Sequence, residues 1–342
     1  MTRRSQPDPK PRRSSADSAR VFPVTTVIPC FQAADTIARA VASALSQNRG
    51  AIRVITVIDG PCADTQRIVE RLNDPRVSLV VNQTNLGAPA SRNRGLGLAT
   101  SPYISFLDAD DYFEGDLLGP LVALMQEEKA DLGFGPSVHL HPQYTRRFGP
   151  DYVDHEDAFV RWFSGIQNVN TASVAWSASY LRSIGGWDEA IRRNQDGELA
   201  LRAILLGARF ARSFEAAGVW VNNSGGARIT SRTDNLGALI DVVDKFEKMR
   251  SDVVPDSARL FACGCRLRRI AMLAYRAGDL GVAAEAMARR RRLGFPDPKF
   301  DTDRLMAALA NPLSPKQREA AWRAASRVKG WLVGNRRAGA QR

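Results

Sequence analysis

Short apolar runs rich in β-branched residues alternate with helical patterns over residues 24–135, and this alternation limits the possible folds more than any other feature. Strand-like runs fall at 24–28, where the run stops before Pro29, and at 53–58, 77–81, 103–107 and 132–138. The segments between them carry apolar residues at helical spacing, and Asp35 and Pro89 are suited to helix starts. Strands that alternate with helices in this way predict a parallel sheet with crossover helices.

Three carboxylates, those of Asp108, Asp110 and Asp111, follow the strand expected at 103–107. The carboxyl ends of strands in an open α/β sheet are where ligands bind. If the strand continues through the acids, Asp108 and Asp110 face the same side and need a cation between them, such as Mg²⁺ or Mn²⁺ bridging a diphosphate. The alternative is a loop of solvated acids in which Asp111 caps the next helix.

The pattern changes after residue 138. A loop and a short helix over a site are expected at 139–170, followed by a strand at 170–176 and a helix from Gln195 to Gly207. Two more strands are expected, at 208–214 and 218–221, and beyond residue 235 only helices, at 236–250, 257–277, 279–293, 303–310 and 315–333. This divides the chain into a disordered basic leader at 1–22, an α/β domain at 23–234 and a helical basic region at 235–342.

The net charge of +12 over 342 residues lies at the two ends of the chain. Residues 23–234 hold 20 Lys and Arg against 23 acids, whereas residues 235–342 hold 22 against 11. Basic ends can attract an anionic membrane surface or nucleic acid. The helix expected at 315–333 interleaves arginines with Trp322 and Trp331, which fits a membrane interface or packing against the domain.

No run of about 18 apolar residues is present, so no span of a membrane is expected. The four cysteines lack the paired spacing of a zinc site, and reduced thiols are expected. These features predict a cytoplasmic protein with peripheral contact at the inner membrane face.

Six motifs, in this order, resemble those of glycosyltransferase family 2, whose members are inverting nucleotide-diphospho-sugar transferases with the GT-A fold. Four resemble the nucleotide-sugar half of that family: VIPCFQ at 27–32, Asp59-Gly60, NLGAPASRN at 85–93 and FLDADD at 106–111. Two resemble the acceptor half: GGWDE at 185–189 and QDGELALR at 195–202. The resemblance covers roughly residues 23–225. It implies an α/β, Rossmann-like domain with a mostly parallel central sheet, to which an α-helical C-terminal extension is added.

The resemblance implies a nucleotide-diphosphate sugar as donor, with a UDP-sugar favoured. The residues expected to bind it are Pro29, Phe31, Asp59, Asn85, Arg92 and Asp108. Asp59 would accept a hydrogen bond from the base, and Arg92, near a helix start after a Gly turn, would reach the diphosphate. Taken by themselves, Asp59 also fits a turn before Gly60, and Arg92 also fits a surface position.

Asp108-Ala109-Asp110 resembles the metal motif of the family, with Asp110 as the ligand of Mg²⁺ or Mn²⁺ and Asp108 on the ribose or a metal-bound water. The metal neutralises the departing diphosphate. Asp196 matches the general base that removes the proton of the acceptor hydroxyl; its alternative role is to cap the helix. Glu198, in the same motif, is counted with the substrate-binding residues, although its charge also supports the helix start.

Three positions depart from the family pattern. Ile58 and Gln195 stand where acids are usual, and residues 220–224 lack the histidine that many relatives carry there. The sequence therefore predicts an inverting, metal-dependent glycosyltransferase of cell-surface glycan or polysaccharide synthesis, acting on a glycan or lipid-linked acceptor. A catalytically impaired nucleotide-sugar-binding or scaffolding protein is the alternative, and nucleic acid is not an expected partner.

Overall fold

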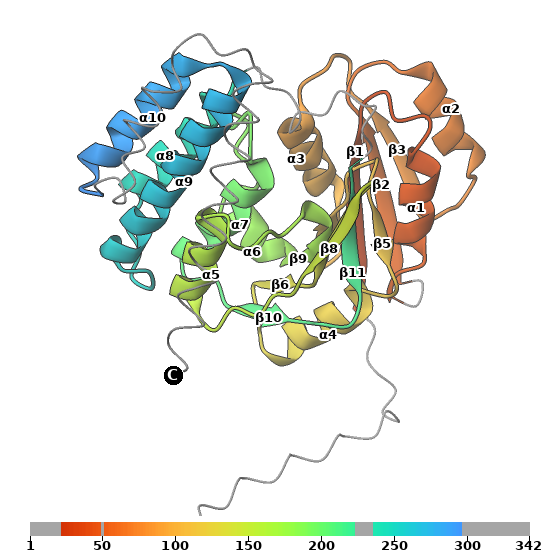
Figure 1. Cartoon of the computed structure of the whole chain (residues 1–342). Coiled ribbons are helices and arrows are strands. Elements are labelled where there is room, and N and C mark those ends of the chain that lie inside the picture. The colour runs from red at the N-terminus through yellow and green to blue at the C-terminus, as the bar shows by residue number, and fades with distance from the viewer. Residues whose placement is uncertain (1–21, 49–50, 223–234, 296–342) are drawn as a thin grey trace, which may run out of the picture.

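The computed structural model describes residues 22–48, 51–222 and 235–295 (Figure 1). Within these residues the centre is a seven-stranded sheet in the order β10-β6-β9-β4-β1-β2-β3. Its strands are β1 (Val24–Cys30), β2 (Ile52–Ile58), β3 (Val77–Val81), β4 (Tyr103–Phe106), β6 (Leu132–Phe134), β9 (Val174–Ser177) and β10 (Phe210–Arg212). Strand β9 runs antiparallel to both neighbours and the other adjacent pairs are parallel. The mostly parallel sheet that the alternation predicts is confirmed.

Helices cover both faces of the sheet because successive strand residues point to opposite sides. Val27 of β1 packs in the same apolar cluster as Leu96 of α3 (Ala88–Leu98), whereas the next residue, Ile28, packs with Ile37 of α1 (Ile37–Leu45). Helices α1 and α2 (Ala63–Arg71) lie on one side of β1–β3 and α3 on the other (Figure 1). Such double coverage explains why these strands read as continuous apolar runs.

The same described part of the chain also holds a second, four-stranded sheet in the order β5-β11-β7-β8. Its strands are β5 (Tyr112–Glu114), β11 (Ala217–Val221), β7 (Ser137–His141) and β8 (Tyr144–Phe148). The single strand expected at 132–138 is therefore wrong, because the chain leaves the central sheet after β6 and enters the second sheet at β7. The residues from 139 onward, expected to form a loop, belong instead to the β7–β8 hairpin, whose second strand is exposed along most of its length and so has no apolar pattern.

Seven further helices follow β5 in the described residues. These are α4 (Leu118–Glu127), α5 (His155–Phe163), α6 (Ala178–Ser183), α7 (Gln195–Leu205), α8 (Ala238–Lys248), α9 (Asp256–Ala277) and α10 (Leu280–Arg292). The first packs in the apolar cluster that contains α1, and the other six pack in the cluster that contains Leu96 of α3. Helices α9 and α10 form a hairpin whose turn uses Gly278 at φ 85°, a conformation that favours glycine. Helix α9 packs against α5 and α8 (Figure 1).

Helices α8, α9 and α10 correspond to the expected helices at 236–250, 257–277 and 279–293. The helices expected at 303–310 and 315–333, and the leader at 1–21, lie outside the described residues. In the part of the chain that the structure describes, no helix has the length and apolar character needed to cross a membrane.

Candidate active site

The sequence motifs meet at the carboxyl ends of β1, β2 and β4. Strand β1 pairs with β2 on one side and β4 on the other, so the chain order reverses beside β1. A reversal of this kind leaves a crevice at the strand ends, and ligands of open α/β folds bind there. Asp59 follows β2 and Asp108 follows β4, which brings two motifs that are far apart in sequence to one edge.

Asp59 is buried and organises the loop after β3. Its Oδ1 accepts hydrogen bonds from the Asn82 side chain at 2.9 Å and the Leu86 N–H at 2.8 Å, and its Oδ2 accepts from the Gly87 N–H at 2.8 Å. Ionised carboxylates offer about four acceptor positions, so one position on Oδ2 remains for a ligand. The motif containing Asn85 is thus shaped by Asp59, while Asn85 itself is exposed and accepts from the Gly87 N–H at 3.2 Å.

The acid-rich segment after β4 is a loop, not a continued strand. Strand β4 ends at Phe106, and the Asp111 N–H donates to the Asp108 carbonyl at 3.0 Å. The expectation that strand periodicity places Asp108 and Asp110 on one side is therefore wrong. Asp111 does not cap a helix either, because its Oδ1 accepts from the Val221 N–H at 2.9 Å and so fastens the loop to β11.

Arg92 crosses the crevice from α3. Its Nη2 donates to Asp108 Oδ1 at 2.5 Å, and its Nη1 donates to Gln195 Oε1, at the start of α7, at 3.2 Å. The guanidinium also stacks over the Trp187 ring, 4.3 Å from the centroid. The Arg92 side chain is only 6% exposed, so it is a built part of the site and not a surface arginine. Its position joins the donor-side loop of β4 to the helix that carries the candidate base.

Asp196 lies in the first turn of α7, one residue after Gln195. The residue before the helix is Asn194, in a left-handed conformation at φ 58°, so Asp196 stands inside the helix and is not its N-cap. Burial raises the pKa of Asp196, the charge of Asp108 raises it further, and the charge of Arg92 lowers it. A carboxyl group held toward the neutral range is suited to general-base chemistry.

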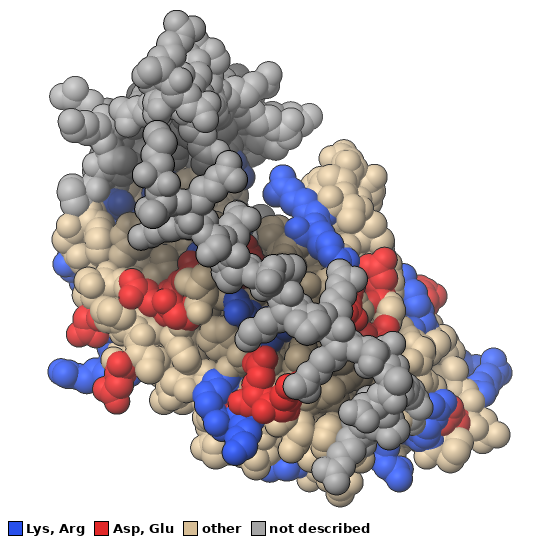
Figure 2. Space-filling view, turned by 90° about the horizontal axis from the view of Figure 1, so that it is seen from below, with Lys and Arg blue, Asp and Glu red and all other residues tan. Residues whose placement is uncertain are grey.

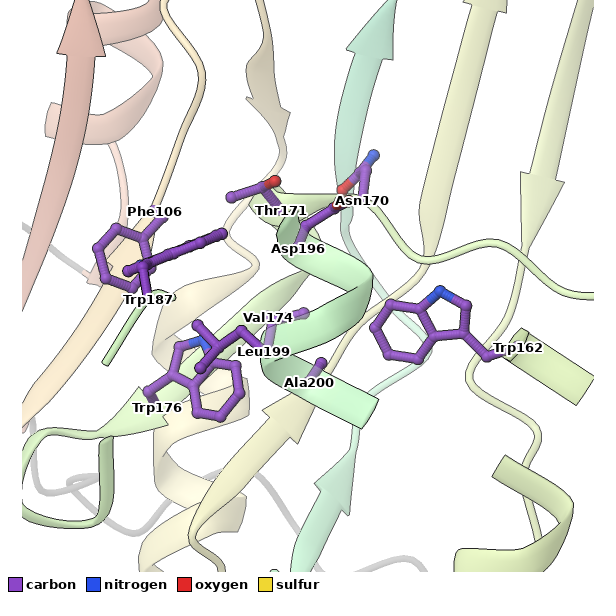
Figure 3. A pocket seen from close by; sticks show the side chains of 10 residues that line it. All are labelled: Phe106, Trp162, Asn170, Thr171, Val174, Trp176, Trp187, Asp196, Leu199 and Ala200. Atoms are coloured by element: carbon purple, nitrogen blue, oxygen red, sulfur yellow. The ribbon is translucent and has the colours of Figure 1, made fainter. Parts of the chain in front are cut away.

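Asp196 is on the wall of a small aromatic pocket, partly open to solvent, whose cavity volume of about 10 Å³ has room for one water molecule. The pocket is lined by Phe106, Trp162, Asn170, Thr171, Val174, Trp176, Trp187, Asp196, Leu199 and Ala200 (Figure 3). These residues come from β4, α5, the segment from Asn170 through β9, the 185–189 turn and α7. The three indole rings are at most 6% exposed, so they pack mainly against the core, and the Asp196 carboxylate is the polar group of the pocket wall suited to accept a hydroxyl proton.

The donor set fits a divalent cation only if a ligand completes it. The described residues contain no group of three His, Cys, Asp or Glu side chains placed to hold a metal. Asp108 and Asp110 are both partly exposed and supply carboxylates from one short loop. Mg²⁺ is usually bound through one or two carboxylates together with substrate phosphates, so these two acids fit a cation that arrives with a diphosphate.

Three of the residues expected to bind substrate differ in their burial and in their contacts. Pro29 is buried inside β1, which continues through it to Cys30, and Phe31 is 56% exposed just beyond the strand. Glu198 is 1% exposed, and its carboxylate contacts Arg202 Nε at 2.7 Å and Lys245 Nζ at 2.6 Å. The structure therefore gives Glu198 two cationic partners in place of a substrate.

Two residues of the site lacked a signal in the sequence. Asn82 links Asp59 to Ser91 through its side-chain amide, with 2.9 Å to each, yet it lies outside the motifs at 59–60 and 85–93. Trp187 lay in the 185–189 motif, but its place beneath Arg92 depends on packing between α3 and the turn.

Comparison with known proteins agrees with this geometry. Residues 25–164 match the family model described as glycosyl transferase family 2. The succinoglycan biosynthesis protein ExoO of Rhizobium meliloti (strain 1021) is 27% identical over 238 residues, which cover 66% of this chain and 68% of that protein. The amylovoran biosynthesis glycosyltransferase AmsB of Erwinia amylovora is 27% identical over 198 residues, covering 54% of this chain and 65% of the relative.

A third relative covers less of both chains. The UDP-Glc:alpha-D-GlcNAc-diphosphoundecaprenol beta-1,3-glucosyltransferase WfaP of Escherichia coli is 35% identical over 106 residues, 31% of this chain and 42% of the relative.

Solved structures share the fold at low sequence identity. The mannosyltransferase PcManGT of Pyrobaculum calidifontis, in complex with GDP-Man and Mn²⁺, superposes with a TM-score of 0.57 at 18% identity, over 93% of this chain and 90% of that one. S. aureus TarS 1–349, in complex with UDP-GlcNAc, gives a TM-score of 0.56 at 14% identity, over 79% of this chain and 92% of that one. The chain therefore contains a glycosyltransferase family 2 domain built on the GT-A fold.

Proposed function

We propose that the chain transfers a sugar from a nucleoside diphosphate donor to a hydroxyl group, with inversion at the anomeric carbon. The observation that carries this proposal is Arg92, which contacts Asp108 at the end of β4 and Gln195 at the start of α7. These contacts support a site in which the candidate base Asp196 lies beside the sheet edge that would receive the diphosphate. Donor activation and acceptor deprotonation can then occur on opposite sides of one crevice.

On the donor side, Asp59 and the loop that it organises receive the nucleoside, with Phe31 and Asn85 exposed at the rim. Arg92 makes charge-assisted hydrogen bonds to the diphosphate, which is the bond type that guanidinium groups make best. Asp110, with Asp108 in support, would hold Mg²⁺ or Mn²⁺. The cation supplies Lewis-acid stabilisation of the departing diphosphate.

On the acceptor side, the hydroxyl of the acceptor faces Asp196, which is partly exposed at the start of α7. The carboxylate accepts the hydroxyl proton as the oxygen attacks the anomeric carbon, opposite the diphosphate. Because the attack and departure are in line, the anomeric configuration inverts. Asp196 must be ionised to act as a base. Because its pKa is raised, it lies closer to the pKa of the acceptor hydroxyl, which makes the carboxylate a stronger base.

The relatives suggest the kind of product and acceptor. ExoO and AmsB are named for the synthesis of succinoglycan and amylovoran, and WfaP for a lipid-diphosphate-linked acceptor. We propose polysaccharide synthesis, with a UDP-sugar as the favoured donor and a glycan or lipid-linked acceptor. The fold neighbours carry UDP-GlcNAc in one case and GDP-Man in another, so the base is the first property to measure.

We also propose that the basic C-terminal region contacts an anionic membrane surface. It holds 22 Lys and Arg against 11 acids over residues 235–342, and α10 ends in four consecutive arginines. Figure 2 shows basic and acidic side chains interspersed on the visible described part of one face, without the broad basic stripe that tracks nucleic acid. Binding to anionic vesicles that weakens as salt rises would support the contact, and binding that is indifferent to salt would oppose it.

The test of the proposed function is a panel of UDP-, GDP- and TDP-sugars scored by release of nucleoside diphosphate, with Mn²⁺ and with EDTA. The proposal expects release from at least one donor, dependent on the cation and faster with a glycan acceptor. Absence of release from every donor, with nucleotide binding retained, would instead indicate a protein that only binds nucleotide sugars. Release that is equal in Mn²⁺ and EDTA would remove the metal from the proposal.

A further inference from the structure

Lys245, on the C-terminal helix α8, contacts two acids of the transferase domain. Its Nζ lies 2.5 Å from Asp188 Oδ2 in the 185–189 turn and 2.6 Å from Glu198 Oε1 in α7. The Asp188 and Lys245 side chains are about 30% exposed, whereas Glu198 is 1% exposed. One ammonium group from beyond residue 235 thus connects the turn and the helix that build the acceptor side of the site.

Arg202 completes this group, which we call the α7 clasp: Asp188, Glu198, Arg202 and Lys245. From α7, Arg202 bonds Glu198 through Nε at 2.7 Å and donates to the carbonyls of Ile184 at 2.5 Å and Gly186 at 2.6 Å. The same arginine therefore pairs with the buried acid and holds the backbone that leads into the turn. Buried carbonyl and carboxylate groups are costly without partners, so these bonds fix the distance between the turn and α7.

The turn held by the clasp carries Trp187. Asn93 of α3 receives the Trp187 N–H at its Oδ1 and donates its Nδ2 to the Trp187 carbonyl, each at 2.9 Å. The Trp187 ring supports the Arg92 guanidinium from below and lines the pocket beside Asp196. A shift of the turn or of α7 would therefore move the stacking partner of Arg92, the hydrogen-bond acceptor Gln195 and the base in one displacement.

We propose that Lys245 is a positioning residue for sugar transfer, acting through the α7 clasp to set Asp196 and Trp187 against the donor site. This inference rests on the proposed function. It makes the helical C-terminal region part of the working site, and it explains why the 195–202 motif carries a buried glutamate that faces cations.

The opposing interpretation is that Lys245 only stabilises the packing of α8. The chain offers a matched control for it in Asp244, the preceding residue of the same helix. Asp244 forms an ion pair with Arg289 of α10, and its side chain is 31% exposed. In the described structure it has no hydrogen bond or ion pair with α7 or the 185–189 turn. Asp244→Asn thus removes an ion pair from α8 without touching the clasp.

The experiment compares Lys245→Met, Lys245→Arg and Asp244→Asn by steady-state transfer, titration of free nucleoside diphosphate, thermal unfolding and hydrogen exchange of residues 184–205. We expect Lys245→Met to lower kcat by about tenfold or more, because a misplaced base loses transition-state stabilisation, while nucleotide affinity changes by less than about threefold. Exchange in 184–205 should accelerate in Lys245→Met alone. Lys245→Arg keeps the charge and should restore most of kcat.

Parental kcat in Lys245→Met, or an equal loss in Asp244→Asn, would overturn the proposal. If Lys245→Met does not fold, Asp188→Asn serves in its place, because it removes one contact of the ammonium group and leaves Glu198 paired. Asp188→Asn should lower kcat by a smaller factor and leave nucleotide affinity unchanged. Parental kcat in Asp188→Asn would count against the clasp. Hydrogen exchange needs no turnover. A parent enzyme that transfers nothing would therefore refute the proposed function, while the exchange data would still show whether Lys245 holds α7.

Discussion

Replacing Arg92 by Met should uncouple the two halves of the site while keeping the apolar stem that packs in the crevice. Removal of one partner from a fully buried ion pair costs about 3–5 kcal/mol. Asp108 is 34% exposed and can be rehydrated, so we take about 2 kcal/mol for the lost ion pair and about 0.5–1 kcal/mol for the contact with Trp187. A loss of about 2.5–3 kcal/mol lowers Tm by about 3–4 °C in a chain of 342 residues.

The effect on turnover should be larger than the effect on folding. A charge-assisted hydrogen bond to the diphosphate contributes about 1.5–3 kcal/mol, so donor turnover should fall by about 10- to 150-fold at a temperature where the variant is folded. Arg92→Lys keeps the charge but cannot contact Asp108 and Gln195 together, and it should recover only part of the activity.

The measurements are calorimetric Tm and nucleoside diphosphate release, with Arg67→Met as the control. Arg67 also has an ion pair, with Asp64, but both side chains are more than 60% exposed, so its loss should cost less than about 1 kcal/mol. If Arg92→Met keeps the parental Tm and turnover, or if Arg67→Met loses as much, the central placement of Arg92 is refuted.

Three further predictions follow from named contacts. Burial and the charge of Asp108 raise the pKa of Asp196 above its unfolded value, so the folded protein loses stability as pH rises through that pKa. Asp196→Asn should therefore raise Tm at neutral pH but not near pH 3. A lower Tm of this variant at neutral pH would contradict the prediction. Asp108→Asn removes a charge that raises this pKa, so the acidic limb of kcat against pH should move to lower pH, and a move to higher pH would count against Asp196 as the base. Gly95→Ala places a methyl group 2.3 Å from Val27 Cγ1 and should cost about 1–3 kcal/mol, whereas Gly97→Ala on the same helix meets nothing within 4 Å and should be neutral or stabilising; equal melting temperatures for the two would contradict the α3 packing.

Much of the central sheet could be predicted from the sequence because its strands are buried on both faces. The runs at 24–28, 53–58, 77–81 and 103–107 are continuous in apolar residues and lie between helical patterns, which few other arrangements produce. The β7–β8 hairpin could not be predicted in the same way. Strand β8 is exposed along most of its length and reads YTRRF, which is the composition of a loop.

Local patterns also gave two wrong helix caps. Asp35 was expected to cap α1, but the residue before the helix is Thr36, and neither caps it with its side chain. Asp111 was expected to cap a helix and instead accepts a hydrogen bond from β11, which is 110 residues away in sequence. Such long-range partners are decided by the packing of two sheets, and a local pattern carries no information about them.

The site residues also divide into those placed by the sheet topology and those whose contacts depend on packing between distant segments. Asp59, Arg92, Asp108 and Asp196 meet at one sheet edge because their motifs follow parallel strands or open helices, which is a consequence of topology. Arg202 lies four residues after Glu198 on the same helix, but the second partner, Lys245, could not be foreseen, since it lies 47 residues later in a helix beyond β11. Their roles in binding and catalysis remain predictions that the experiments above decide.

The most direct test of the central claim is sugar transfer by Asp196→Asn, measured beside Asp64→Asn and with nucleoside diphosphate affinity determined for both. Asp64 is a matched control because it also stands in the first turn of a helix, α2, but is exposed. If Asp196 is the general base, transfer by Asp196→Asn falls by about 10²- to 10⁴-fold while nucleotide affinity stays parental, and Asp64→Asn transfers normally. Transfer by Asp196→Asn at the parental rate would contradict the account.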